Sequence, residues 1–172
     1  MTRRSSWKLK KAMDSRAITL VLGLRRMGKR PLIKVATADI TKVYVDARRF
    51  EERNYITYRD FMEEFRGALN TLIPKHRKML NSLKSISGIK IGEVGIDFSW
   101  KESKPLFSSV LEALNAWAEG ERKRLIIVID EVQELIKLKG FNMIPVIAYA
   151  YDNLRNLSFV FAGSKVGLSS TS

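Results

Sequence analysis

Short apolar runs alternate along the chain with longer stretches in which apolar residues recur at helical spacing. Four runs rich in β-branched residues predict buried strands, at 18–22, 42–46, 125–131 and 158–162. Apolar positions three and four residues apart predict helices at 7–13, 32–36, 58–73, 105–120, 132–138 and 145–154. Strands that alternate with helices pair in parallel and are covered on both faces. The pattern therefore predicts an α/β fold with a mainly parallel sheet.

The segment 86–100 departs from this pattern, because its apolar residues alternate with polar ones. Apolar side chains alternate before and after a turn at 92–95, at positions 89, 91, 94, 96, 98 and 100. Alternation around a glycine-bracketed turn predicts a β-hairpin inserted into the α/β chain. Since an isolated hairpin is marginally stable in water, this one has to pack against the domain or a partner.

Positive charge is concentrated at the N-terminal end of the chain. The formal net charge is +13, and residues 1–50 hold 14 Lys and Arg against three Asp and Glu. A basic field of this kind steers polyanions, either ATP or nucleic acid, toward that end of the molecule. A solvated basic face without a ligand is the alternative. In the same region, the apolar side of the predicted helix at 7–13 consists of Trp7, Leu9, Ala12 and Met13, and Trp7 is expected to pack inward.

Length and composition indicate one globular domain over residues 1–172. The chain is 45% hydrophobic, which is enough to bury a core, and no apolar run approaches the length of a membrane-spanning helix. The basic N-terminus lacks the features of a signal peptide. The absence of cysteine excludes disulfides and thiolate metal sites. A cytoplasmic protein without a membrane contact is therefore expected.

The first predicted strand leads into a glycine-bracketed basic loop. The pattern Gly23-x-x-x-x-Gly28-Lys29 is that of a phosphate-binding loop, in which the glycines let successive backbone N–H groups point at a phosphate. Lys29 adds a positive charge, and the helix that follows directs its N-terminus at the same anion. The residues predicted to contact the phosphates are Gly23, Arg25, Arg26, Met27, Gly28, Lys29 and Arg30.

Two further strands deliver polar residues at their carboxyl ends. The apolar run from Leu125 ends in Asp130 and Glu131, which fits the acidic strand of P-loop nucleotidases, and the last predicted strand delivers Ser164. Ligands of open parallel sheets bind outside the carboxyl ends of the strands. Asp130, Glu131 and Ser164 are therefore expected beside the phosphate loop. The structural alternatives are a helix-capping pair of carboxylates and a turn serine.

These motifs resemble those of the archaeal ATPase family of P-loop proteins, which is related to the AAA+ and STAND groups. The resemblance extends to segments 43–48, 130–133, 148–154 and 161–168, so it spans nearly the whole chain. It implies a three-layer α/β/α fold with ATP held by Lys29 and the loop amides. It also implies that Asp130 holds Mg²⁺ through water and that Glu131 orients or deprotonates the attacking water. Ser164 would contact the γ-phosphate or that water.

Family members continue past this last strand into a lid and a winged-helix-like region, whereas this sequence stops at Ser172. Residues 1–172 are thus expected to form the nucleotide-binding domain without those regions, truncated before the fifth strand that commonly lies beside the first. The first strand is then expected at an exposed sheet edge, which another copy or another protein would cover.

Arg30 stands where P-loops have Ser or Thr, and Pro31 follows it. Arg30 removes a Mg²⁺ ligand and adds a positive charge near the cation, while Pro31 lacks a backbone N–H. Weaker metal and nucleotide binding are expected, and Arg30 itself is a candidate phosphate ligand. Three functions remain open: an ATP-binding and hydrolysing domain, a non-hydrolysing module that contacts another copy or a protein through the sheet edge or the hairpin, and a nucleic-acid binder.

Overall fold

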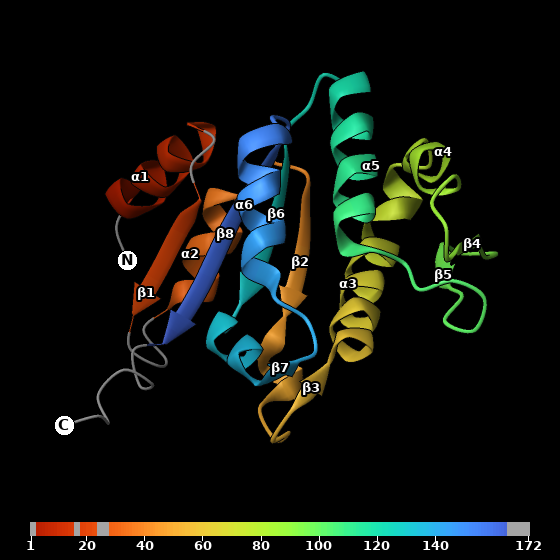
Figure 1. Cartoon of the computed structure of the whole chain (residues 1–172). Coiled ribbons are helices and arrows are strands. Elements are labelled where there is room, and N and C mark those ends of the chain that lie inside the picture. Colours follow the sequence, from red (N-terminus) through yellow and green to blue (C-terminus); the bar gives the residue numbers. More distant parts are fainter. Residues whose placement is uncertain (1–2, 16–17, 24–27, 165–172) are drawn as a thin grey trace.

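The computed structural model describes residues 3–15, 18–23 and 28–164 (Figure 1). In this part of the chain, four strands form one sheet in the order β1 (Thr19–Gly23), β8 (Leu157–Ser164), β6 (Leu125–Asp130) and β2 (Lys42–Asp46). Every neighbouring pair in this sheet is parallel. The α/β fold with a mainly parallel sheet is confirmed.

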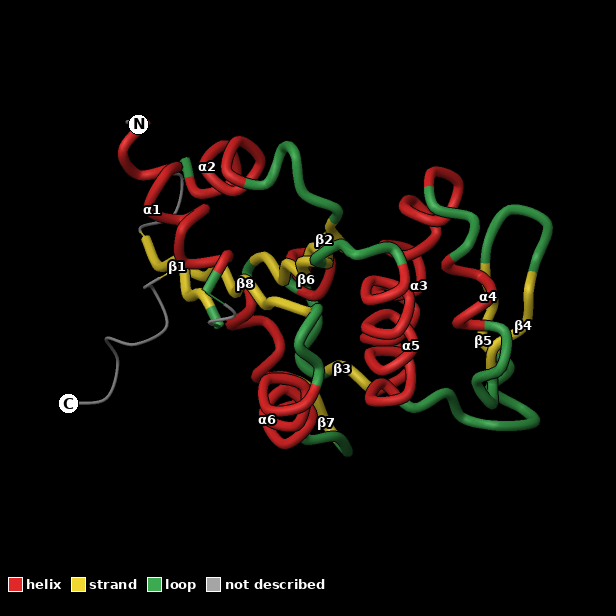
Figure 2. The backbone as a smooth tube through the Cα atoms, turned by 90° about the horizontal axis from the view of Figure 1, so that it is seen from above, coloured by secondary structure: helices red, strands yellow, loops and turns green. Residues whose placement is uncertain are grey.

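Helices cover both faces of the sheet. α1 (Arg3–Asp14) and α2 (Lys29–Ala36) lie on one face, and α6 (Met143–Asn153) lies on the other (Figure 2). α3 (Tyr58–Leu72) and α5 (Phe107–Gly120) extend this second layer beside β2. The arrangement is the three-layer α/β/α architecture expected from the sequence.

The strand β6 is apolar along its whole length because both of its faces are covered by helices. All of its side chains are buried, and they alternate between the two helical layers. Ile126 and Val128 pack with α1 and α2, whereas Ile127 and Ile129 pack with α3, α5 and α6. A continuous apolar run is therefore required here, and Asp130 is placed at the point where the run ends.

The helix α3 begins at a capping box and buries an aromatic stripe. The Thr57 hydroxyl accepts the Asp60 backbone N–H at 3.2 Å, and the Asp60 carboxylate accepts the Thr57 backbone N–H at 2.8 Å. Phe61 and Phe65 pack edge to face against Phe107 of α5, each with a ring-centroid distance of 5.1 Å. These contacts join α3 and α5 into one layer.

The predicted β-hairpin is present and is anchored to α3. Strands β4 (Ile89–Ile91) and β5 (Ile96–Phe98) pair antiparallel. The Asn70 side chain of α3 bonds the backbone of Ile96 twice, accepting its N–H at 2.9 Å and donating to its carbonyl at 3.0 Å. The hairpin thus packs against the domain, as its marginal stability requires.

The remaining described elements are short. They are the helix α4 (Met79–Leu83), the 3₁₀ helices η1 (Ala47–Phe50), η2 (Ile73–Lys75) and η3 (Val132–Lys137), and the parallel strand pair β3 (Ile56–Thr57) and β7 (Leu138–Lys139). Among all described helices, none is long and apolar enough to cross a membrane.

Three local predictions were wrong. α5 begins at Phe107 rather than at Pro105, because Leu106 is extended (φ −88°, ψ 130°). The Tyr58 hydroxyl bonds both sides of it, donating to the Pro105 carbonyl at 2.7 Å and accepting the Phe107 N–H at 2.8 Å. The predicted helix at 132–138 is the 3₁₀ helix η3, which ends at Lys137 because Leu138 is extended (φ −67°, ψ 122°) and begins β7. Trp7 does not pack inward: its side chain is 60% exposed, while Leu9 and Met13 supply the buried face of α1.

Candidate phosphate-binding site

The carboxyl ends of all four parallel strands meet at one edge of the sheet. Gly23 of β1 is in register with Ser164 of β8, and Asp46 of β2 is in register with Asp130 of β6. A cavity of about 480 Å³ opens at this edge. Its lining is mostly charged and consists of Gly28, Lys29, Arg30, Pro31, Arg48, Glu51, Asp130 and Glu131.

Lys29 is held at the ends of the strands by backbone carbonyls. Gly28 precedes α2 with φ 71° and ψ 26°, a left-handed conformation that suits glycine and lets the chain turn from the loop into the helix. The Lys29 ammonium donates to the Gly163 carbonyl at 2.8 Å and to the Gly23 carbonyl at 3.3 Å. It lies 3.9 Å from the Glu131 carboxylate. Lys29 is thus a nearly buried cation, 8% exposed, at the wall of the charged cavity.

Part of the predicted phosphate loop lies outside the described residues. Arg25, Arg26 and Met27 belong to this part, so their phosphate contacts stay predictions. The described members Gly23, Gly28, Lys29 and Arg30 surround the same strand ends. The structure therefore brings together the cationic end of the loop and the acidic end of β6, as the sequence predicts.

Glu131 and Ser164 contact each other directly. The Ser164 hydroxyl donates to Glu131 Oε2 at 2.8 Å, and the Gln133 amide donates to the same oxygen at 2.6 Å. Glu131 has φ 52° and ψ 48°, a left-handed conformation that is uncommon for a residue with a Cβ. The two hydrogen bonds orient the Glu131 carboxylate at the wall of the charged cavity.

Asp130 is buried and bonded to Arg30. Its carboxylate is 1% exposed. Asp130 Oδ1 accepts the Glu131 backbone N–H at 3.0 Å. Asp130 Oδ2 accepts both Arg30 Nε at 2.7 Å and the Tyr44 hydroxyl at 2.6 Å. Both oxygens of the predicted Mg²⁺ ligand are therefore engaged by protein donors.

The same guanidinium bridges to a second carboxylate. Arg30 Nη2 donates to Asp46 Oδ2 at 2.6 Å, and Arg48 Nη2 donates to that oxygen at 2.9 Å. Burial alone would raise the pKa of Asp46, but hydrogen bonds from Arg48 and Arg30 outweigh it and hold the pKa below its ordinary value. Burial, with the hydrogen bond to Asp130, raises the pKa of Tyr44, so its hydroxyl stays a donor.

A magnesium ion does not fit this arrangement. Asp130 has no oxygen without a hydrogen bond from the protein, and Arg30 replaces the hydroxyl ligand of a P-loop. Among the described residues, no group of three acidic or histidine side chains could hold a metal ion. Mg²⁺ prefers near-octahedral oxygen coordination and is repelled by a guanidinium at its own position.

The lowered pKa of Asp46 gives a prediction for acid stability. A carboxyl with a depressed folded-state pKa stabilises the fold fully above its unfolded pKa, and this contribution is lost as the pH falls through the folded pKa. We expect Asp46→Asn to lower the free energy of unfolding by about 1 kcal/mol at neutral pH. The difference from wild type should shrink as the pH is lowered through about 4 toward 2. Urea unfolding at several pH values measures it.

Asp39→Asn serves as the control for this prediction. The Asp39 side chain is 88% exposed and its nearest cation is 3.8 Å away, so its removal should leave the stability unchanged at every pH. An Asp46→Asn variant with the same small, pH-independent effect would contradict the role assigned to the Arg30 and Arg48 contacts.

The structure adds four residues that the sequence analysis did not single out as site residues: Tyr44, Asp46, Arg48 and Gln133. A signal for Asp46 was present, because it ends a predicted parallel strand just as Asp130 does. Gln133 belongs to the segment 130–133 that supports the family resemblance. Tyr44 and Arg48 belong in the same way to the segment 43–48, but their contacts with Asp130 and Asp46 depend on the pairing of β2 with β6.

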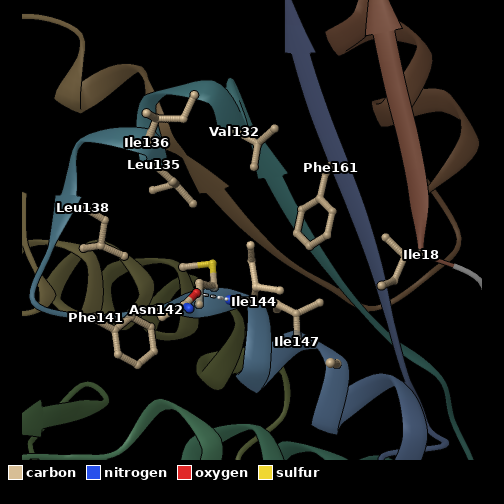
Figure 3. A pocket seen from close by; sticks show the side chains of 12 residues that line it. Ile18, Val132, Leu135, Ile136, Leu138, Phe141, Asn142, Ile144, Ile147 and Phe161 are labelled. Carbon is tan, nitrogen blue, oxygen red and sulfur yellow. Dashed lines mark hydrogen bonds between the residues drawn. The ribbon is translucent and has the colours of Figure 1, made fainter.

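A second cavity of about 540 Å³ lies on the sheet face that carries α6 (Figure 3). Its walls are mostly apolar and come mainly from η3, α6 and the segment 138–142 between them. Val132, Phe161 and Ile18 are among the side chains directed into it. None of Lys29, Arg30, Asp130 and Glu131 lines it. The two cavities are therefore distinct, and the charged one contains the candidate chemistry.

The fold and the site together define a P-loop ATPase-like domain. The Walker-type ATPase PABY2304 of Pyrococcus abyssi is similar to this chain, with a TM-score of 0.67, 27% identity, and coverage of 94% of this chain and 44% of that one. The chain has the P-loop fold of such archaeal ATPases.

More distant structures share this fold. The ORC2 protein of Aeropyrum pernix in ADPNP and ADP complexes has a TM-score of 0.53 and 12% identity, covering 94% of this chain and 40% of that one. Cdc6p of Pyrobaculum aerophilum has a TM-score of 0.51 and 13% identity, covering 94% and 38%. The chain spans less than half the length of each of these three proteins. No protein-family model and no curated protein sequence matches it.

Proposed function

We propose that this domain binds ATP in the charged cavity, with the polyphosphate between Lys29 and the N-terminus of α2. The observation that supports this most is the position of Lys29, a nearly buried ammonium at the carboxyl ends of β1 and β8. The present partners of the Lys29 ammonium are two neutral carbonyls and a carboxylate 3.9 Å away. A phosphate can therefore pair with this ammonium without unfolding the site. The nucleotide in the ORC2 structure supports ATP as the ligand class.

ATP hydrolysis is the second part of this proposal. Glu131 would orient or deprotonate the attacking water. Ser164 would position Glu131 through the hydrogen bond it already makes, or would contact the γ-phosphate or that water instead. The protein's contribution is positioning and electrostatics. Since the residues present do not fit Mg²⁺, turnover is expected to be slow compared with metal-dependent P-loop enzymes.

Calorimetric titration tests the binding proposal. We expect ATP to bind with a Kd below about 1 mM, and AMP to bind at least about tenfold more weakly, because it lacks the two outer phosphates that reach Lys29. Titration of inorganic tripolyphosphate measures the affinity for the phosphates alone, and its difference from the ATP affinity gives the contribution of the base and sugar. Absence of heat with millimolar ATP, both in EDTA and in MgCl₂, would rule the proposal out.

Nucleic-acid binding is a second candidate function, supported by the exposed face of α1. Trp7 is 60% exposed, and Arg4, Lys8 and Lys11 are exposed at helical spacing around it, opposite the buried Leu9 and Met13. The Lys11 ammonium lies 5.2 Å from the centre of the Trp7 ring. A cationic face with an accessible aromatic ring suits phosphate contacts combined with base stacking.

This candidate predicts salt-dependent binding of a fluorescent oligonucleotide, measured by anisotropy with single-stranded and duplex DNA. Affinity should fall steeply between about 50 and 200 mM salt, and Lys8→Ala with Lys11→Ala should reduce the salt slope by about two. Lys75→Ala with Arg77→Ala is the control, because it removes the same charge from exposed positions after α3. Equal effects of the two double variants, or no binding at low salt, would contradict it.

A protein contact through the sheet edge remains part of the proposal. In the described part of the chain, β1 has a strand neighbour on one side, and its Leu20 and Leu22 side chains are 57% and 47% exposed. Exposed backbone groups and apolar side chains along an edge strand favour pairing with another strand. The occupant would be a second copy or another protein.

A further inference from the structure

We propose that the Arg30 guanidinium takes the place of the divalent cation in this P-loop domain, so that the site binds polyphosphate without metal. The inference rests on the proposed ATP binding and specifies its ligand: a nucleoside triphosphate free of Mg²⁺. Arg30 occupies the sequence position that supplies a hydroxyl ligand to Mg²⁺ in P-loop proteins, so a cation replaces the residue that would have held one.

The guanidinium joins the two carboxylates that end neighbouring strands. Asp46 and Asp130 are in register on β2 and β6, and Arg30 binds an oxygen of each, at 2.6 Å and 2.7 Å. These distances are those of short charge-assisted hydrogen bonds. A cation bridging two in-register carboxylates has the bridging role of a bound metal ion, and it is covalently part of the chain.

Neighbouring side chains hold the two carboxylates that Arg30 binds in place. The Tyr44 hydroxyl donates to the same Asp130 oxygen at 2.6 Å, and Arg48 donates twice to Asp46. The Arg30 side chain is 32% exposed, whereas that of Asp130 is 1% exposed. Displacing Arg30 by a metal would leave a partly buried guanidinium without its carboxylates, which is costly.

Arg30 also faces the cavity where the phosphates are proposed to lie. Its side chain lines the charged cavity together with Lys29. A guanidinium has five N–H donors, and the described contacts with Asp46 and Asp130 use one on Nε and one on Nη2. The remaining donors can meet a phosphate oxygen, so one side chain can link the acidic strand ends to the polyphosphate as a metal ion does elsewhere.

Two measurements on the full chain test the inference. The first is Mn²⁺ binding to the protein alone, followed by the electron paramagnetic resonance signal of free Mn²⁺. The second is ATP affinity by calorimetry, in EDTA and in MgCl₂. Both are made on wild type, on Arg30→Thr, which restores a hydroxyl, and on Lys34→Thr, which removes one exposed positive charge from the same helix. Mn²⁺ binding is also measured on Asp130→Asn, which removes the charge of the carboxylate that Arg30 binds.

For wild type and Lys34→Thr, we expect no Mn²⁺ binding at millimolar concentration and an ATP affinity that changes less than about twofold between EDTA and MgCl₂. For Arg30→Thr, we expect Mn²⁺ binding to appear and MgCl₂ to raise ATP affinity by about tenfold or more.

Three results would overturn the inference: Mn²⁺ binding by wild type that is lost in Asp130→Asn, a tenfold or larger gain in wild-type ATP affinity with MgCl₂, or an Arg30→Thr variant that behaves as wild type in both measurements. Absence of ATP binding by wild type in both buffers removes the proposed function instead. The Mn²⁺ comparison then still decides whether Arg30 holds the cation position.

Discussion

Replacing Lys29 by methionine is expected to weaken ATP binding by about 10- to 100-fold, the loss associated with one charge-assisted contact to a phosphate. The aliphatic stem of Lys29 runs beside Gly23. Methionine has a similar unbranched apolar stem, so the packing at the strand ends is retained. The lost group is the ammonium that now donates to the Gly163 and Gly23 carbonyls. Calorimetric titration of ATP into each protein measures the effect.

Lys34→Met provides the matched control. Lys34 is exposed on the same helix α2, so its substitution removes the same charge from the N-terminal field but no group from the cavity. A loss of less than about twofold is expected, since solvent screens an exposed charge at this distance. Equal weakening by the two substitutions would mean that the general basic field, not Lys29, attracts the nucleotide. Unchanged affinity of Lys29→Met would contradict the proposed site.

Local sequence signals predicted the sheet and its helices well because each depends on neighbouring residues. The run 42–46 is β2 with the same bounds, since its apolar alternation places Val43 and Val45 in the core. The capping box at Thr57 uses residues three apart, and it fixes the start of α3 as predicted. Parallel pairing then follows from the alternation of strands and helices.

The cation network could not be predicted in the same way. Arg30 and Asp130 are 100 residues apart, and their contact depends on the order β1-β8-β6-β2 and on the register of Asp46 with Asp130. The sequence marked Arg30 as an exception to the P-loop pattern but gave it a role toward phosphates, because phosphates were the partners visible in the motif. The sequence does contain two strands that end in aspartate and an unexpected arginine, but only the fold brings these three residues together as an internal ion pair.

Trp7 illustrates a different limit. Its spacing from Leu9 and Met13 fits loosely with the apolar side of a helix, but only the position of the sheet decides which face turns inward. In the structure Leu9 and Met13 contact the sheet and Trp7 faces away. An exposed aromatic residue among lysines therefore becomes a candidate contact surface only after the fold is known.

Phe107→Ala is expected to lower the free energy of unfolding by about 3 to 5 kcal/mol, a large share of the 5 to 15 kcal/mol typical of a domain. Phe107 is 1% exposed and lies edge to face against Phe61 and Phe65. Its truncation removes apolar burial, three aromatic contacts, the third with Phe141, and the side chain that fills the space between α3 and α5. Urea unfolding followed by circular dichroism measures the loss.

Two controls define what this loss reports. Leu106→Ala changes a neighbouring side chain that is 55% exposed, so an effect within about 0.5 kcal/mol is expected. Phe107→Leu keeps most of the volume and should cost less than Phe107→Ala. Comparable costs for Phe107→Ala and Leu106→Ala would contradict the α3–α5 layer.

Stability and ATP affinity are expected to change independently in these variants. Since Phe107 does not line the charged cavity, the folded Phe107→Ala protein should bind ATP with wild-type affinity. Lys29→Met should lose affinity without a comparable loss of stability.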